Sequence, residues 1–166
     1  MTTRPSTTAE GTATATDTAT LATAEAEVRA HFEKNRLAWA DTDAYGATFT
    51  EDADYVTFFG GRMRGRHEIE EGHRGLFEGV LKGSRLWAAV DSVVLPAPDV
   101  ALVHARGGVL KGRRTRPSAR ARSVQTYVMV RGADGEWLIR AFQNTRRRPR
   151  VEAFSNWLAG FAPKQR

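Results

Sequence analysis

The chain has no cysteine among its 166 residues, which excludes disulfide bonds, thiolate-bound zinc, iron–sulfur clusters and a cysteine nucleophile. It also lacks any apolar run that approaches the roughly 20 residues needed to cross a bilayer. Its threonine-rich beginning has no apolar segment of the kind found in secretory signals. We therefore expect a soluble protein of the reducing cytoplasm that has no membrane partner.

Acidic residues are scarce toward the C-terminus. Residues 1–100 hold 10 Lys/Arg and 16 Asp/Glu, whereas residues 101–166 hold 15 and 3, so the two parts carry net charges of −6 and +12. Arginines cluster in two runs, at 111–116 and 146–150. We interpret the runs as solvated loops, because no aromatic residues interleave with them as a single-strand nucleic-acid groove requires. The alternatives are an acidic partner such as a carrier domain and, ranked last, nucleic acid.

Length and composition favour one folded domain. A chain of 166 residues with 41% hydrophobic residues suits a single core. Residues 1–20 are mostly small or polar and have no apolar periodicity, which predicts a disordered tail. The folded domain is expected at 21–148, and a basic segment with a short amphipathic helix at 149–166. The apolar residues of that helix are Phe154, Trp157, Leu158 and Phe161.

Apolar spacing predicts three helices before the sheet. The first covers about 22–40, and the second begins after residues 41–43, whose side chains suit an N-cap, and ends at a break over 50–52. The third follows Gly65 and ends near Gly83, a glycine suited to the C′ position. Its apolar stripe contains Ile69, His73, Leu76, Phe77 and Val80.

Alternating patterns predict a small hairpin and then a set of long strands. The hairpin strands are 55–59 and 62–64, joined by Gly60-Gly61, and the long strands are 85–95, 100–111, 119–131 and 137–146. Helices followed by an antiparallel meander indicate an α+β fold. Three helices on one face of a curved sheet leave a cavity between the layers, where small ligands bind.

Several strings resemble one known superfamily. Trp39-Ala40-Asp41-Thr42-Asp43, the segment 49–56, Gly65-Arg66-His67-Glu68-Ile69 and the segment 134–139 resemble SnoaL-like proteins of the nuclear-transport-factor-2-like superfamily, over about residues 22–148. The segments 124–126 and 141–146 resemble the SgcJ/EcaC-type branch. The resemblance implies a cone-shaped, curved antiparallel sheet whose three N-terminal helices enclose a pocket. It also implies a homodimer and a role in enediyne or polyketide antibiotic biosynthesis.

No cofactor is expected. The chain has no Gly-x-Gly-x-x-Gly that opens a helix after a strand, no phosphate-binding Walker loop and no metal ligand set. The oxidoreductase label often attached to the SgcJ/EcaC-type branch therefore finds no support in the sequence. Ketosteroid isomerases share the fold, but their catalytic aspartate and tyrosine fall near Thr57 and Asn35 here, so their chemistry is not transferred.

Four histidines are candidates for proton transfer. His73 lies on the inner stripe of the third helix, where an imidazole can act as acid or base, or can be a hydrogen-bonded core residue. His67 is expected to cap its helix locally, and His31 to be exposed. His104 lies in the middle of a strand, and the sequence does not decide which face of the sheet it occupies. No pair of histidines has the spacing of a metal site together with a nearby acidic residue.

Polar and aromatic residues of the strands could bind a substrate. Period-two alternation in 137–146 assigns Gln143 to the cavity, where it would orient a carbonyl or hydroxyl group. Gln125 is a weaker candidate, because the facing of its strand stays open, and Asn144, on the other face of the last strand, is a further one. Tyr55 could donate to an oxyanion or simply pack in the core.

The remaining candidates have ordinary structural readings as well. Trp39 and Trp87 could stack on a flat polyketide or belong to the core or a dimer contact. Asp52 and Asp54 are interpreted as turn formers at the end of the second helix rather than as bases. Arg106 needs a partner or a solvent face.

The leading hypothesis is a pocket protein that binds a small hydrophobic polyketide or polyene and transforms it by cofactor-independent proton transfer. His73 would be the acid/base and Gln143 would orient the substrate. A non-catalytic binding or chaperone module is the alternative. A homodimer is expected to form through apolar residues on the outer face of the sheet, with Leu138 and Phe142 among them.

Overall fold

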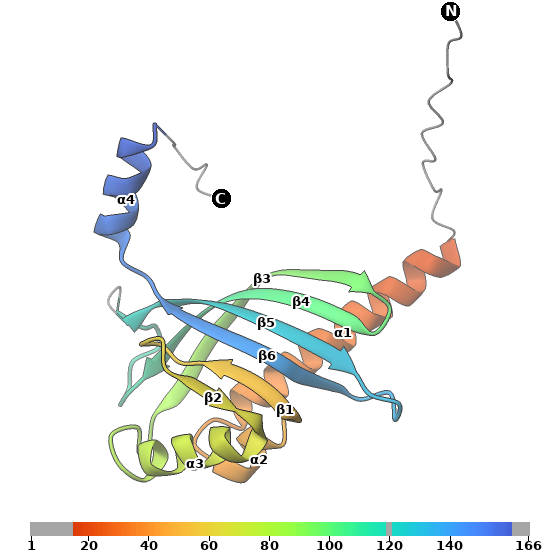
Figure 1. The fold of residues 1–166 in the computed structure, drawn as a ribbon, viewed down its shortest axis with the longest axis horizontal. Coiled ribbons are helices and arrows are strands. Elements are labelled where there is room, and N and C mark those ends of the chain that lie inside the picture. Colours follow the sequence, from red (N-terminus) through yellow and green to blue (C-terminus); the bar gives the residue numbers. More distant parts are fainter. Residues whose placement is uncertain (1–14, 119–120, 161–166) are drawn as a thin grey trace, which may run out of the picture.

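The computed structural model describes residues 15–118 and 121–160 (Figure 1). Its elements follow the order α1 (Ala15–Leu37), α2 (Thr42–Gly46), β1 (Phe49–Val56), β2 (Arg62–Arg64), α3 (Gly65–Glu78), β3 (Arg85–Ala97), β4 (Val100–Leu110), β5 (Ser123–Arg131), β6 (Trp137–Arg146) and α4 (Pro149–Leu158). The chain therefore has the expected α+β architecture, with three helices before the long strands.

A curved six-stranded sheet forms the body, with strand order β2-β1-β6-β5-β4-β3. The expected antiparallel meander of four long strands is present, and β1 pairs antiparallel with β2. The expected antiparallel sheet contains one parallel pair, because β1 lies parallel to β6. In Figure 1, α1 passes behind the long strands, and α2 and α3 lie beside β1 and β2. The helices thus cover one concave face.

The core fills the space between α1, α3 and the concave face. Phe32 of α1 meets Tyr127 of β5 edge to face, with ring centroids 5.3 Å apart. Val28, Ile69 and Ile139 are fully buried around them. Removing each such side chain from water contributes about 1.5–3 kcal/mol, so this cluster fixes the helices on the sheet.

Local signals explain several of the boundaries. Asp41 is the N-cap of α2, as expected, and its carboxylate accepts a hydrogen bond from the Ala44 N–H at 3.0 Å. The third helix ends earlier than predicted, at Glu78, with Gly79 as its C-cap. Gly75 and Gly79 favour helix poorly, and Gly83, with a φ of 68°, lies in the turn before β3.

The prediction that residues 50–52 form a break after the second helix is wrong, because these residues lie in β1, which runs without interruption from Phe49 to Val56. Asp52 and Asp54 are therefore strand residues, not turn formers. Arg62 on β2 donates two hydrogen bonds to the Asp54 carboxylate and holds its pKa below the usual range. Polar residues occupy the exposed face of β1, and such a run of polar residues is also typical of a loop.

A β-bulge in β6 inverts the alternation of that strand. Met129 pairs with Ile139 and Val128 pairs with Ala141, so Arg140 is an extra residue. Arg140 points away from the core and donates to the Asp52 carbonyl oxygen at 2.7 Å. Before the bulge the odd positions Trp137 and Ile139 are buried, and after it the inward position passes to Phe142, which is 4% exposed. The prediction that Phe142 lies on the outer face is therefore wrong.

The two ends of the described chain project from the sheet (Figure 1). Residues 15–20 belong to α1 rather than to the predicted tail, and the rest of that tail lies outside the described residues. The predicted C-terminal helix is present as α4, and none of its residues is buried. Phe154 and Trp157 stack on its surface with ring centroids 6.1 Å apart; Phe161 lies outside the described residues. No helix of the described part is long and apolar enough to span a membrane.

Candidate functional site

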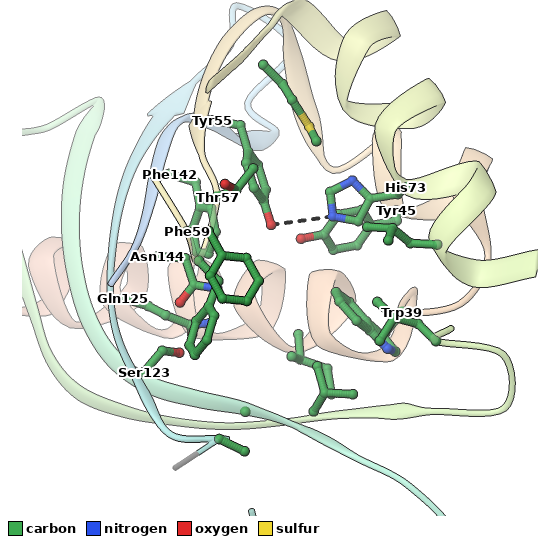
Figure 2. Close-up of a pocket in the computed structure, with 18 of the residues that line it drawn as sticks. Trp39, Tyr45, Tyr55, Thr57, Phe59, His73, Ser123, Gln125, Phe142 and Asn144 are labelled. Atoms are coloured by element: carbon green, nitrogen blue, oxygen red, sulfur yellow. Dashed lines mark hydrogen bonds between the residues drawn. The ribbon is translucent and has the colours of Figure 1, made fainter. Parts of the chain in front are cut away.

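A cavity of about 400 Å³ lies between the concave face of the sheet and helices α2 and α3. Figure 2 shows Gln125, Ser123, Asn144 and Phe142 on the sheet side, opposite Tyr45 and His73 on the helix side. Its walls are mostly apolar, with Met63, Leu76, Leu81 and Leu86 among them. Two lining residues are strongly exposed: Phe59 at 85% and Val80 at 63%. They mark the side on which the cavity opens to solvent.

His73 faces the cavity from α3 in a defined protonation state. Its Nδ1 lies 2.7 Å from the Ile69 carbonyl oxygen, an atom that only accepts, so Nδ1 carries a proton. Burial lowers the pKa of His73, against the opposing effect of the Ile69 bond, so the ring is neutral near pH 7. Nε2 is then an acceptor, and the Tyr55 hydroxyl donates to it across 3.4 Å (Figure 2).

Two phenols adjoin this imidazole. Burial raises the pKa of Tyr55 to about 12, and burial also raises the pKa of Tyr45 well above its ordinary value. Both hydroxyls therefore keep their protons at neutral pH and can act as donors. The Tyr45 ring centroid lies 4.9 Å from that of His73. The site thus combines one neutral base with two protonated donors in an apolar enclosure.

The sheet side supplies amide groups. Gln125 is 3% exposed, and its Oε1 accepts a hydrogen bond from the Tyr127 hydroxyl at 3.1 Å. Gly107 on the neighbouring strand makes room for it, because a Cβ at that position would overlap the Gln125 side chain. The Asn144 side-chain oxygen is buried and has no hydrogen-bond partner among the described residues. An orphaned acceptor in an apolar cavity favours a ligand that brings a donor.

Five of the seven residues proposed for the site line this cavity: His73, Tyr55, Trp39, Gln125 and Asn144. Their roles stay predictions. The placement of Gln143 in the cavity is wrong, because the bulge turns its side chain to solvent. Trp87 does not line this cavity and instead borders two other pockets.

Sequence reasoning missed Tyr45. Its only signal is an aromatic residue in a helix of five residues. So short a helix has no apolar periodicity that could show which of its side chains point inward. Thr57, at the position compared with an isomerase base, does line the cavity, whereas Asn35 does not. The Asn35 amide donates to the Thr48 hydroxyl at 2.8 Å and is part of the core.

The other histidines lie outside the cavity. The prediction that His31 is exposed is wrong: it is 6% exposed, and its Nε2 lies 3.0 Å from the Thr48 carbonyl oxygen. His104 is exposed and adjoins Thr126. His67 is exposed as well, and Glu68 rather than His67 caps α3, by accepting from the Arg64 N–H. Within the described ranges, no three His, Asp or Glu side chains are grouped as a metal site requires.

Fold and cavity define the class of structure: the chain has an α+β fold that it shares with solved proteins described as cystatin-like and as NTF-2-like. A domain of unknown function with a cystatin-like fold from Nostoc punctiforme is 30% identical, over 86% of this chain and 89% of that one, with a TM-score of 0.70. The chain belongs to the family of that domain.

Two further solved structures share the fold at lower identity. An NTF-2-like protein of unknown function from Shewanella oneidensis is 16% identical over 73% of this chain and 98% of that one, with a TM-score of 0.62. A protein from Catenulispora acidiphila in complex with S-DNPA is 22% identical over 80% and 98%, with a TM-score of 0.63. No protein-family model matches the chain, and no curated protein matches it significantly.

Proposed function

We propose that this protein binds a hydrophobic polyketide or polyene intermediate of secondary metabolism and transforms it by cofactor-independent proton transfer. The observation that carries the proposal is the neutral His73, whose Nε2 lone pair faces the cavity beside the Tyr55 hydroxyl. The resemblance to SgcJ/EcaC-type proteins supports antibiotic biosynthesis as the setting. The Catenulispora protein in complex with S-DNPA supports a small-molecule ligand for a cavity of this fold.

The shape and polarity of the cavity restrict the ligand. Its volume, about 400 Å³, suits a small molecule, and its walls are mainly aliphatic and aromatic. Trp39 and Phe142 offer flat surfaces to a conjugated or ring-shaped substrate. The orphaned oxygen of Asn144 selects ligands that carry a hydroxyl or another donor at that end.

The proton transfer follows from the resting hydrogen bonds. When a carbonyl substrate enters, the Tyr55 hydroxyl turns from Nε2 to the carbonyl oxygen and leaves the Nε2 lone pair free. Nε2 then takes a proton from the carbon next to the carbonyl, the C–H electron pair moves into the C–C bond, and the carbonyl pair moves onto oxygen. Tyr55 stabilises that oxyanion by donation. In a substrate with a C=C bond next to the deprotonated carbon, the enolate is conjugated, and the imidazolium returns its proton to the far carbon of that bond while the oxyanion pair re-forms the carbonyl. This step moves the C=C bond into conjugation with the carbonyl and regenerates neutral His73.

A non-catalytic binding role is the second candidate, and one observation favours it. Nε2 already accepts from Tyr55, and burial lowers the pKa of His73, so the imidazole is a weaker base than a free one. The same cavity would then shield a reactive intermediate from water.

Hydrogen exchange distinguishes the two roles. The probe is 2-tetralone, an apolar ketone with exchangeable hydrogens next to its carbonyl, followed by proton NMR in deuterated buffer. If the protein catalyses proton transfer, it accelerates exchange, and His73→Gln removes at least nine-tenths of the acceleration while tryptophan fluorescence still reports binding. Tyr55→Phe lowers the acceleration as well, because the oxyanion loses its donor.

Each outcome decides between the roles. Binding without accelerated exchange in the wild-type protein sinks the catalytic proposal and leaves the carrier role. Exchange that persists in His73→Gln assigns the base elsewhere. Lack of binding by wild-type protein across apolar ketones, phenols and polyenes overturns both roles.

A further inference from the structure

A second concave site lies beside the cavity, where four arginines from three parts of the chain meet. Arg106 comes from β4, Arg116 and Arg122 from the connection between β4 and β5, and Arg147 from the segment after β6. Together with Trp87 they line a depression of about 340 Å³. Arg106 is exposed between the buried residues Ala105 and Gly107, so the depression opens on the outer face of the sheet.

Positive charge at this depression is not balanced by its surroundings. Arg106 pairs with Asp91 at 2.8 Å, and Arg147 pairs with Glu152 at 3.0 Å. The side chains of Arg116 and Arg122 have no ion pair among the described residues, and no carboxylate of that part lines the depression. The two existing pairs are exposed and contribute little to stability. Two of the four guanidinium groups that line the depression are therefore without an ion pair among the described residues.

Packing holds the floor of this depression in place. Pro117 is buried in the connection and lies against Gly108 of β4, where a Cβ would overlap the proline ring. The Arg147 N–H donates to the Arg122 carbonyl oxygen at 3.2 Å, which ties the two basic segments together. The arginine runs, interpreted from sequence as separate solvated loops, thus adjoin one another in space.

We propose that this arginine-lined depression binds the phosphate group of a small phosphate ester. Guanidinium groups recognise phosphate oxygens in a two-pronged geometry, and several of them compensate its double charge. The enclosed shape suits a compact anion better than an extended strand, and only one aromatic ring, that of Trp87, adjoins the arginines. The buried Ser123 lines both this depression and the apolar cavity, but none of the four arginines lines the cavity, so the phosphate site can be tested separately from the proposed function.

Isothermal titration calorimetry with inorganic pyrophosphate tests the site at low ionic strength. The test variants are Arg122→Gln and Arg116→Gln. The matched control is Arg113→Gln, which removes the same charge from the same connection but from a residue that does not line the depression. We expect each test variant to weaken pyrophosphate binding at least tenfold and the control to weaken it less than twofold. Tryptophan emission should change on binding, since Trp87 borders the site.

Two results would overturn the proposal. Equal weakening in the control and test variants means that pyrophosphate responds to net charge only. Tighter binding of single-stranded oligothymidine, with an affinity that falls equally in all three variants, means a diffuse polyanion surface. Circular dichroism of each variant checks folding, and Arg122→Lys, which keeps the charge but not the two-pronged geometry, should recover only part of the affinity.

Discussion

Substitution of Asn144 by leucine should stabilise the protein and weaken ligand binding at the same time. The Asn144 side-chain oxygen is buried in the cavity wall without a partner among the described residues. An unsatisfied buried polar group costs about 1–3 kcal/mol, and leucine removes it while it keeps the same branched shape and number of heavy atoms. Because the rest of this side chain is partly exposed, we expect a gain of about 1 kcal/mol in the free energy of unfolding.

A matched control comes from the core. The Asn35 amide is 2% exposed and donates to the Thr48 hydroxyl. The same substitution there, Asn35→Leu, removes a satisfied hydrogen bond and should cost about 1–2 kcal/mol. Urea unfolding followed by circular dichroism measures both variants. The two identical chemical changes should thus shift the unfolding midpoint in opposite directions.

Ligand binding provides the second half of this test. The probes are 2-naphthol, which has a donor, and 2-methoxynaphthalene, which has the same rings without one. Wild-type protein should prefer 2-naphthol about tenfold, because one hydrogen bond to a buried acceptor contributes about 1–1.5 kcal/mol. Asn144→Leu should abolish the preference. If Asn144→Leu destabilises the protein, or if the preference survives, the reasoning about the orphaned oxygen is refuted.

Three further predictions concern other parts of the molecule. Burial lowers the pKa of His31 and of His73 below 6.5 in the folded protein. As the pH falls, these histidines are therefore protonated first in the unfolded chain, which favours unfolding. The stability that is present above about pH 6.5 is lost as the pH falls through the folded-state pKa values. The loss is at most about 1.4 kcal/mol per pH unit for each histidine; urea titrations at several pH values measure it, and a flat profile between pH 7 and pH 5 would contradict it. Deletion of Arg140 removes the bulge but leaves Phe142 two positions after Ile139, on the same inner face and opposite the same β5 residues, so we expect a loss of about 1 kcal/mol or less, close to that of Arg140→Ala; a loss of more than about 3 kcal/mol, as expected if Phe142 turned outward, would argue against the bulge. Trp157→Ala should leave the unfolding free energy within about 0.5 kcal/mol of wild type, since Trp157 is 74% exposed; a larger loss would mean that α4 packs on the domain.

Sequence patterns predicted the elements well where one rule governs a segment. The strand bounds at 62–64 and 137–146 agree with β2 and β6, because glycine turns and aromatic alternation delimit them. The inner stripe of α3 was also predicted correctly at Ile69, His73 and Phe77, which are all buried. Helical periodicity is robust when one face is apolar and the other is charged.

The errors arise where geometry departs from simple periodicity. Alternation in β6 is interrupted at Arg140, so counting by two from Trp137 assigned Gln143 to the wrong face. No residue type signals such a bulge, because the extra position is an ordinary arginine. Because of the bulge, Asn144 rather than Gln143 points toward the cavity. The lack of a hydrogen-bond partner for its side-chain oxygen is evident only in three dimensions. Convergence of Arg116, Arg122 and Arg147 likewise depends on how two connections fold together.

The most direct test of the central claim is a crystal structure of the protein with 2-tetralone bound. The account predicts the ketone in the cavity, its carbonyl oxygen within hydrogen-bond distance of the Tyr55 hydroxyl, and the adjacent carbon against His73 Nε2. A ketone bound elsewhere, or a cavity closed by its own side chains with the Tyr55–His73 hydrogen bond intact, would contradict it.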